Sequence, residues 1–541
     1  MAATEKQGLL AHGEQTTPRN RQWRGGNWRW RLAILLSLAT VGMLGCWEAG
    51  IEGHTTILQY SPPASSVFLP FTTTPKDKKS HHHHHNQNFD PYKHLGHLSP
   101  FFEPPNTPTS LKSGTPPSCT ATSRAFLIHR HGSRNPHADE LAVIQGLADY
   151  IKNNSALFSN PQADVPFAWS FLARGSWNNT LGTDDLTAPG RQQLFDHGVA
   201  LRLRYPDLYV EPDDESDDAD SDARDALAVA GDEDRVVESA EWFLAGYYGR
   251  AAAGNGTGNG NGSGNRKTSS PPALKVIPED AHTPSWITPH STCSAWDEQY
   301  GGNLTERWGA VYLPPIAARI NDLLERAWPG VHFSPAHVHA MFWACAYGTA
   351  ARGVGSSPWC GVFEPEELLR NEYEYDLRQR GFSGYGLPGD MGAVLGGLLV
   401  GNVTAFLRGE DEEKKFSLNF GHDKTLAFGL TALGLAADGD GDDAFPPEGP
   451  VDPHRSWQSA RLVPFASYML WKRLECGGAE GSSGSRIQLI LNGANYGLGP
   501  TGCAIDEYGT CGFDDFLGTD KVKAALNVTH GGERWKEVCE H

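Results

Sequence analysis

The 541-residue chain lacks several patterns that would assign it to well-known classes of protein. None of its nine cysteines forms a Cys-x-x-Cys pair, so a thioredoxin-like redox site or a zinc ribbon has little support. No internal repeat of the solenoid type occurs along the sequence. The formal net charge of −19 excludes a general nucleic-acid binder, and a polyanionic ligand would need a locally basic pocket.

Long apolar runs are also scarce, with one exception near the N-terminus. Residues 1–31 are polar and rich in arginine, and the short apolar segment 32–47 follows them. This order is typical of a signal peptide or of a signal anchor. The segment is short for a membrane span, but no clean small-x-small cleavage site accompanies it. We therefore expect a cytosolic basic tail at 1–31 and, at 32–47, either an uncleaved type II anchor, which we favour, or a signal peptide.

The next segment, 48–118, is of low complexity and rich in proline, threonine and histidine. Such a composition buries too little apolar area to offset the chain entropy that folding removes. We therefore expect a disordered stalk over 48–118. The histidine run 81–85 lacks a rigid support, so we do not expect it to be a catalytic metal site.

Cysteines and glycosylation sequons indicate an oxidising, extracytosolic environment for the rest of the chain. Eight cysteines follow Cys46, an even number that suits four disulfides. Seven Asn-x-Ser/Thr sequons predict a glycoprotein of the secretory pathway. These sequons begin at Asn153, Asn178, Asn255, Asn261, Asn303, Asn402 and Asn527.

The region 119–541 has the hydrophobic periodicity of a folded domain, with an acidic loop at 211–234 and a Gly/Asn linker at 251–272 inserted. Within it, the stretch LIHRHGSRNP at 127–136 ends an apolar strand. We expect Asn135 to cap the following helix and Pro136 to begin it. The clustered positive charges therefore lie where a strand leads into a helix, which is the usual ligand position in an open α/β sheet.

The residue types in this cluster suit a phosphate monoester. Arg130 and Arg134 can give permanently charged, bidentate contacts to phosphate oxygens, and Gly132 allows close approach of the backbone. His131 lies between the arginines, whose charge lowers its proton affinity. A neutral ring nitrogen could then attack phosphorus and form a phosphohistidine, which water would hydrolyse.

A second strand end supplies the proton that the leaving alkoxide needs. His422 and Asp423 follow the alternating strand FSLNF and precede a helical pattern. We assign Asp423 as the proton donor and His422 as a ligand of a phosphate oxygen. Since the arginines neutralise the phosphate charge, this chemistry needs neither a metal nor another cofactor.

These motifs resemble those of the histidine acid phosphatases. The hallmark Arg-His-Gly-x-Arg-x-Pro matches 130–136, and the His-Asp pair matches His422 and Asp423. A third arginine of the family, in Arg-x-x-x-Ser-Ala, matches Arg235. The resemblance implies that His131 is the nucleophile and Asp423 the proton donor. The implied phosphate ligands are Arg130, Arg134, Arg235 and His422.

The resemblance also implies a fold and a disulfide pattern. The fold is α/β, a doubly wound mixed-sheet core with a smaller, mainly α-helical domain inserted, and the site lies in the cleft between them. The spacing of eight cysteines allows 105 pairings and selects none. The fungal members imply Cys119–Cys476, Cys293–Cys539, Cys345–Cys360 and Cys503–Cys511.

Within the family the chain looks most like the fungal phytases and the multiple inositol polyphosphate phosphatases. The latter usually carry His-Ala-Glu, whereas this chain has His-Asp-Lys, as acid phosphatases and fungal phytases do. We therefore expect a phosphomonoesterase acting on phytate or other inositol polyphosphates, with no nucleic-acid partner. The alternatives are a broad-specificity acid phosphatase, a mutase-type phosphotransferase and a catalytically silent phosphate-binding module. The oligomeric state stays open.

Overall fold

The computed structural model describes residues 89–173, 177–209, 226–249, 271–297, 299–410, 414–439, 444–477 and 483–540. The expected basic tail and signal segment, at 1–31 and 32–47, lie outside the described residues, so the membrane anchor stays a prediction.

A mixed sheet of eight strands forms the centre of the described chain, in the order β3-β2-β4-β1-β5-β6-β7 with β8 beside β6. Strands β1, β2, β3 and β4 run parallel, and β5 to β8 add antiparallel pairs. The carboxyl ends of the four parallel strands therefore meet at one edge of the sheet. The strands are β1 Cys119–Arg130, β2 Ala226–Gly231, β3 Leu274–Ile277, β4 Phe416–Gly421, β5 Tyr468–Gly477, β6 Ser483–Leu491, β7 Ala494–Tyr496 and β8 Cys511–Gly512.

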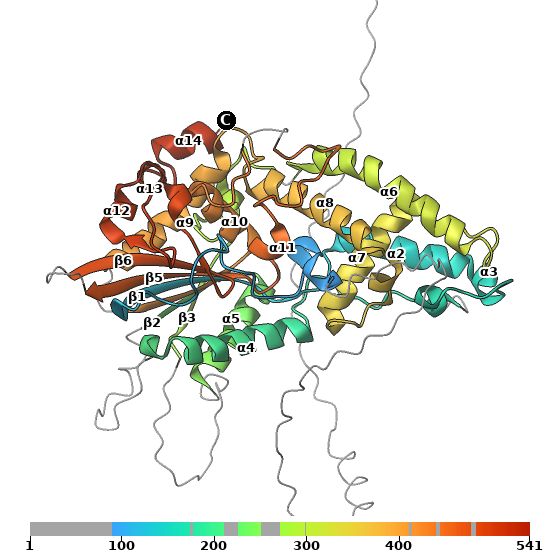
Figure 1. Ribbon diagram of the computed structural model, residues 1–541, viewed down its shortest axis with the longest axis horizontal. Helices are drawn as coiled ribbons and strands as arrows, with labels where there is room; N and C mark the ends of the chain where they lie inside the picture. The colour runs from blue at the N-terminus through green and yellow to red at the C-terminus, as the bar shows by residue number, and fades with distance from the viewer. Residues whose placement is uncertain are drawn as a thin grey trace, which may run out of the picture. The chain divides into compact units, whose positions relative to one another are not determined.

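Both faces of the sheet are covered, which explains why β1 ends in an unbroken apolar run. Ala125 and Leu127 pack in one core cluster, with α4 and α5, whereas Phe126 and Ile128 pack in another, with α9 and α10. Figure 1 shows α4 and α5 below the sheet and α9 and α10 above it. The bounds are α4 Ala188–Arg204, α5 Asp234–Tyr248, α9 Met391–Arg408 and α10 Asp423–Ala432.

A second group of helices lies beside the sheet, on the right in Figure 1. Its members contact one another, with α6 against α8 and α7 against both α2 and α6. The fold is therefore the expected α/β core with a mainly helical part drawn from the middle of the chain. These helices are α2 Ala138–Asn153, α3 Ser155–Ser159, α6 Gly302–Leu324, α7 Pro335–Arg352 and α8 Pro365–Ser383. Shorter ones complete the fold: α11 Ser459–Leu462, α12 Phe513–Gly518, α13 Asp520–Leu526, α14 Glu533–Cys539, and the 3-10 helices η1 Pro91–Lys93, η2 Gly96–Leu98, η3 Phe167–Leu172, η4 Pro206–Leu208, η7 Pro289–Thr292, η8 Pro358–Val362 and η9 Gly499–Thr501.

The stalk prediction for 48–118 is wrong for its last part, 89–118. Leu95 and Leu98 are each only 1% exposed in the main core, and the main-chain oxygen of His97 accepts a hydrogen bond from Arg130. Apolar and aromatic residues are concentrated in this part, and averaging them with the His/Pro/Thr-rich stretch before it concealed them. Residues 48–88 lie outside the described residues.

Two other boundaries also differ from expectation. The acidic loop predicted at 211–234 ends earlier, because the apolar run 226–231 forms the buried strand β2 between β3 and β4. The helix after β1 is capped by His137 and begins at Ala138, two residues after Pro136. Asn135, expected to be the cap, instead accepts a hydrogen bond from the main-chain N–H of Gly182 at 3.2 Å.

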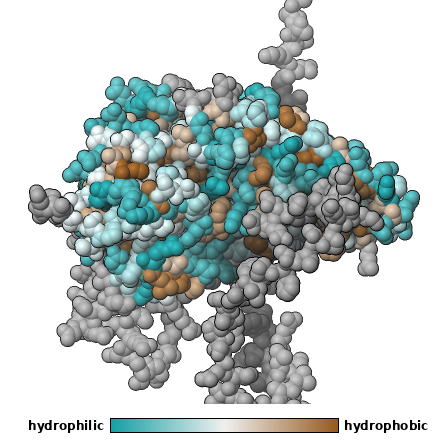
Figure 2. All heavy atoms as spheres, in the orientation of Figure 1, coloured by the Kyte–Doolittle hydropathy of each residue, from teal (hydrophilic) through white to brown (hydrophobic). Residues whose placement is uncertain are grey.

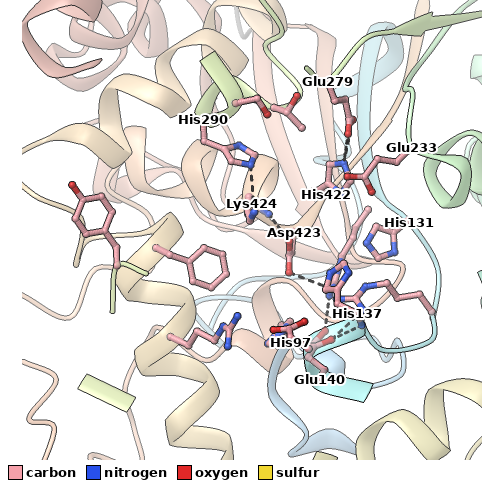
Figure 3. Close-up of a pocket in the computed structure, with 18 of the residues that line it drawn as sticks. His97, His131, His137, Glu140, Glu233, Glu279, His290, His422, Asp423 and Lys424 are labelled. Carbon is pink, nitrogen blue, oxygen red and sulfur yellow. Dashed lines mark hydrogen bonds and ion pairs between the residues drawn. The ribbon is translucent and has the colours of Figure 1, made fainter. Parts of the chain in front are cut away.

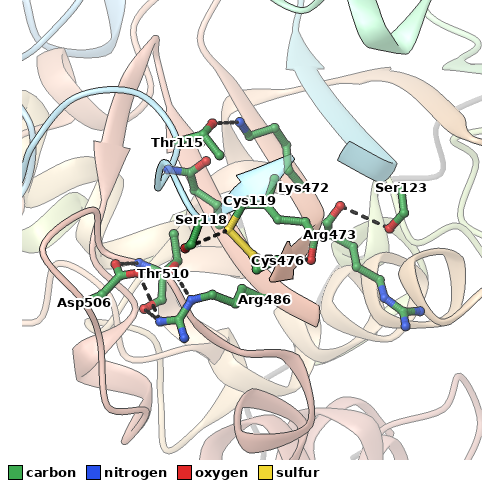
Figure 4. Close-up of a disulfide and its surroundings, with 12 residues drawn as sticks. Thr115, Ser118, Cys119, Ser123, Lys472, Arg473, Cys476, Arg486, Asp506 and Thr510 are labelled. Atoms are coloured by element: carbon green, nitrogen blue, oxygen red, sulfur yellow. Dashed lines mark hydrogen bonds and ion pairs between the residues drawn. A yellow bond between two sulfur atoms is a disulfide. The ribbon is translucent and has the colours of Figure 1, made fainter. Parts of the chain in front are cut away.

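Four disulfides form within the described residues, and they are the four that the family resemblance implies. They join Cys119 to Cys476, Cys293 to Cys539, Cys345 to Cys360 and Cys503 to Cys511. The first links β1 to β5 near their ends (Figure 4). Five predicted glycosylation residues, Asn153, Asn178, Asn303, Asn402 and Asn527, are exposed, whereas Asn255 and Asn261 lie outside the described residues.

Among the described residues, α9 is long and apolar enough to cross a membrane. Two thirds of its apolar window is buried inside the protein, between the sheet and α13, as expected for a core helix. The face visible in Figure 2 is largely hydrophilic, with apolar side chains scattered in small groups. Such scattering is ordinary for a protein surface.

A buried histidine pair behind β1 predicts a loss of stability in acid. His129 donates through Nδ1 to the Arg130 carbonyl at 2.6 Å, and its Nε2 lies 3.0 Å from Nδ1 of His197. Burial lowers the pKa of His129 to about 4 and that of His197 well below its ordinary value. Since the unfolded chain binds more protons below about pH 6.5, the free energy of unfolding should decrease as pH falls from 6.5 to 4, by about 3 kcal/mol for His129 alone.

The variant His129→Gln removes one of these titrations while keeping a donor for the Arg130 carbonyl. Its free energy of unfolding, measured by denaturant titration with the disulfides intact, should depend less steeply on pH between 6.5 and 4 than that of the wild type. Equal slopes for the two proteins would show that His129 does not carry this dependence.

Candidate active site

The carboxyl ends of the four parallel strands bring the predicted residues together. They line a cavity of about 510 Å³ together with residues of the helical part, including Glu140 and Arg378. Figure 3 shows His131, His422 and Asp423 side by side in this cavity. Strand β1 supplies Arg130 and His131, β2 leads to Glu233 and Arg235, β3 to Glu279, and β4 to His422 and Asp423.

His131 is buried and oriented as the nucleophile would need to be. Its Nδ1 lies 2.8 Å from the carbonyl oxygen of Gly132, which can only accept, so Nδ1 carries the proton and Nε2 keeps its lone pair. Burial, followed by the charges of Arg235 and Arg130, holds the pKa of His131 well below its ordinary value. The ring therefore stays neutral in mild acid, and burial contributes more to this than the arginines do.

Arg130 is fixed from several sides. Its side chain is 1% exposed, and Nη1 donates to the carbonyl oxygens of His97 at 2.5 Å and Val463 at 2.6 Å. Its guanidinium carbon lies 4.5 Å from the centre of the Phe465 ring. Nη2 lies 3.3 Å from Oδ2 of Asp423. The guanidinium thus spans the space between the strand end and the predicted proton donor.

The other two arginines are held by carboxylates. Nη1 of Arg134 lies 3.4 Å from Oε2 of Glu140, which also accepts from the Tyr347 hydroxyl at 2.6 Å. Nη1 of Arg235 lies 3.0 Å from Oδ2 of Asp184, and its Nη2 pairs with Glu233. All three predicted arginines are therefore preorganised by protein groups.

Asp423 accepts hydrogen bonds on both oxygens. Gln379 donates to Oδ2 at 2.9 Å, and the main-chain N–H of Lys424 donates to Oδ1 at 2.8 Å. Burial favours the protonated form, but the charge of Arg130, followed by those of His97 and Lys424, outweighs it and holds the pKa of Asp423 well below its usual range. The predicted proton donor is therefore ionised in this structure.

His422 lies against His131, with 5.7 Å between the ring centres. Its Nε2 does not point to a guanidinium but lies 2.9 and 3.1 Å from the two oxygens of Glu279. Sequence analysis did not identify Glu279, although it follows a parallel strand as the predicted site residues do. The signal was the dipeptide Pro-Glu after LKVI at 274–277, which is too short a strand to recognise from its sequence.

Other residues of the cavity were also missed. His97 lies in the segment predicted to be a stalk, and burial lowers its pKa to about 3. Glu233 lies in the segment predicted to be an acidic loop, and no motif drew attention to His290 or Arg378. Lys424, which directly follows the His-Asp motif, also lines the cavity, and its Nζ lies 3.3 Å from Nε2 of His290.

Within the described part of the chain, Glu233, Glu279 and His422 form a group whose ligand atoms lie within 4.8 Å of one another, as a metal ion would require. These side chains are already paired, Glu233 with Arg235 and Glu279 with His422. The pairing accounts for their proximity, and we assign no metal to them.

Comparison with known proteins agrees with this geometry. Residues 124–492 match the family described as the histidine phosphatase superfamily (branch 2). The thiamine-repressible acid phosphatase pho4 of Schizosaccharomyces pombe is 29% identical over 461 residues, covering 80% of this chain and 86% of that protein. Phytase A of Aspergillus oryzae is 27% identical over 477 residues, covering 83% and 91%.

Solved structures show the same fold. The phytase from D. castellii superposes with a TM-score of 0.64 at 19% identity, covering 84% of this chain and 88% of that one. A multiple inositol polyphosphate phosphatase of Bifidobacterium longum, in complex with inositol hexasulfate, gives 0.50 at 14% identity, covering 75% and 92%. Since the matched family region spans more than half of the chain, this protein belongs to branch 2 of the histidine phosphatase superfamily and is a histidine acid phosphatase.

Proposed function

We propose that the protein hydrolyses phosphomonoesters through a phosphohistidine on His131. The observation that carries this proposal is the hydrogen bond from Nδ1 of His131 to the Gly132 carbonyl, which leaves the lone pair of Nε2 as the nucleophile. Nε2 attacks phosphorus as the bond from phosphorus to the ester oxygen breaks. Arg130, Arg134, Arg235 and His422 hold the phosphoryl oxygens and neutralise their charge.

Asp423 gives its proton to the leaving alkoxide in the first step. In the second step its carboxylate takes a proton from water, whose oxygen attacks the phosphohistidine and restores His131. The phosphate would lie between the arginines and Asp423, so its negative charge would oppose ionisation of that carboxyl. Substrate binding therefore raises the pKa of Asp423 from the low value that Arg130 imposes.

Inositol polyphosphates, including phytate, are the substrates that we propose first. The cavity of about 510 Å³ extends beyond the groups around His131 to Lys424 and Arg378, which supply cations for further phosphates. The similarity to phytases in sequence and fold supports the same proposal.

A broad-specificity acid phosphatase is the second candidate. Besides Asp423, the carboxylates of Asp139, Glu140, Glu233 and Glu279 line the same cavity, and they would repel a substrate with many phosphates. The similarity to the acid phosphatase pho4 supports this alternative.

We also propose that the protein enters the secretory pathway, either as a type II membrane protein or as a secreted one. The four disulfides and five exposed sequon residues support an oxidising, glycosylating compartment.

The test is phosphate release by the full chain from phytate, a lower inositol phosphate and an aryl phosphate, across acid and neutral pH. We expect activity to fall as pH rises, because Asp423 in the complex loses its proton as the pH passes through its pKa. Similar kcat/KM values for all three esters would favour the broad phosphatase. An activity that appears only with added divalent metal at neutral or basic pH would contradict the mechanism.

A further inference from the structure

All four predicted phosphate ligands contact protein carboxylates in this structure, Arg130 through Asp423 and Arg134 through Glu140. His422 is bonded to Glu279, and the two side chains are only 9% and 6% exposed. Arg235 is bonded to Asp184 and Glu233, whose side chains are about 40% exposed. Glu279 is thus shielded from solvent far more than the two carboxylates that bind Arg235, so solvent screens its charge less than theirs.

The turn that follows β2 fixes the position of Glu279. Its main-chain N–H donates to Oδ1 of Asp232 at 3.0 Å. Its carboxylate rests directly on Gly231, where a Cβ atom would come within 1.5 Å of Oε1. Any side chain at position 231 would displace the carboxylate. Glu279 is therefore held at His422 by the backbone around it.

Negatively and positively charged side chains consequently lie on different sides of the cavity. Glu233 and Glu279 lie together beside His422, whereas Lys424 and His290 lie together on the other side of that ring in Figure 3. The Nζ of Lys424 lies 4.8 Å from the centre of the Trp296 ring, so its cation is held over that ring within the pocket. A substrate with several phosphates meets repulsion on one side of His131 and attraction on the other.

We propose that Glu279 is a specificity-determining and positioning residue of the phosphatase. Its acceptor oxygens orient the His422 ring for the scissile phosphate. Its charge, with that of Glu233, weakens binding of polyanionic esters and turns their remaining phosphates toward Lys424 and Arg378. This inference rests on the proposed function, since it assumes that the scissile phosphate lies at His131.

The test compares Glu279→Gln, which keeps an acceptor but loses the charge, with Glu279→Asp, which keeps the charge. The full chain hydrolyses an aryl phosphate at pH ~6, and the competitive inhibition constants of inositol hexasulfate and of inorganic phosphate are measured in that assay. In Glu279→Gln the inhibition constant for hexasulfate should fall about tenfold relative to that for inorganic phosphate. In Glu279→Asp the ratio should stay close to that of the wild type.

Two further variants separate charge from position. Asp139→Asn removes an exposed carboxylate that lines the same cavity, and it should change the ratio by less than about twofold because solvent screens it. Glu279→Ala removes the acceptor as well as the charge. Its kcat for the aryl phosphate should therefore fall about tenfold, while Glu279→Gln restores most of it.

An unchanged inhibition ratio in Glu279→Gln would overturn the specificity role, and equal kcat values for the Ala and Gln variants would overturn the positioning role. If Glu279→Gln fails to fold, Glu279→Ala, which removes the same charge, is measured in its place, and an unchanged ratio there would count equally against the charge argument. A wild-type chain that hydrolyses no phosphomonoester would instead refute the proposed function itself.

Discussion

Replacing His131 with alanine is expected to lower kcat for every phosphomonoester by about 10⁴-fold or more. The variant loses the group that the geometry presents as the nucleophile, with its Nδ1 proton held by the Gly132 carbonyl. The arginines remain, so phosphate should still bind. Measured separately, the inhibition constant for inorganic phosphate should change far less than kcat.

The adjacent Ser133 gives a matched control in the same loop. It is buried, and its main-chain N–H donates to Gln193 at 2.9 Å, so Ser133→Ala should keep the loop in place and retain activity within about threefold. Wild-type enzyme mixed with labelled ester and quenched in alkaline denaturant should retain label on histidine. Label retained by His131→Ala, or lost from Ser133→Ala, would contradict His131 as the nucleophile.

The central residues of this site could be predicted because each lies in a local motif at a strand end. Arg130, His131 and Arg134 follow an apolar run, and His422 and Asp423 follow an alternating one. The structure places these motifs side by side because β1 and β4 are adjacent and parallel. The sequence could therefore place both motifs at strand ends, whereas the adjacency of the two strands comes from the structure.

Glu279 and His97 could not be predicted, because their importance depends on contacts made across the sequence. Glu279 is 143 residues from His422 and follows a strand of only four residues. His97 belongs to a segment that is stabilised by packing against the core, which composition does not reveal. Arg130 donates a hydrogen bond to the main-chain carbonyl of His97, which lies 33 residues earlier in the sequence.

The direction in which the pKa of Asp423 is shifted could not be predicted from the sequence either. A carboxylic acid that donates a proton suggests a raised pKa, and burial does act in that direction. The lowering comes from the position of Arg130, at 3.3 Å, and from the charges of His97 and Lys424. The proposed mechanism therefore requires Asp423 to acquire its proton when the substrate binds, a requirement that the sequence did not indicate.

The variant Asp423→Asn is expected to slow hydrolysis by an amount that depends on the leaving group of the ester. Hydrolysis of phytate, whose leaving group is an alkoxide, should slow about 10²- to 10⁴-fold, since the alkoxide no longer receives a proton. The leaving group of an aryl phosphate is a phenolate, a much weaker base than an alkoxide, so the phosphorylation step with this ester should slow by less than about tenfold. In the place of Oδ2, the amide oxygen can still accept from Gln379 and Arg130, while the bond from the Lys424 main-chain N–H is lost.

The measurement is burst kinetics with both esters, because the second step also uses Asp423. In the variant, the aryl phosphate should give a rapid burst of phenol release followed by slow turnover, as phosphohistidine accumulates. The burst should also lose the pH dependence that the wild type shows, since no carboxyl at 423 then titrates. Equal slowing of the burst for phytate and the aryl phosphate would mean that another group protonates the leaving oxygen.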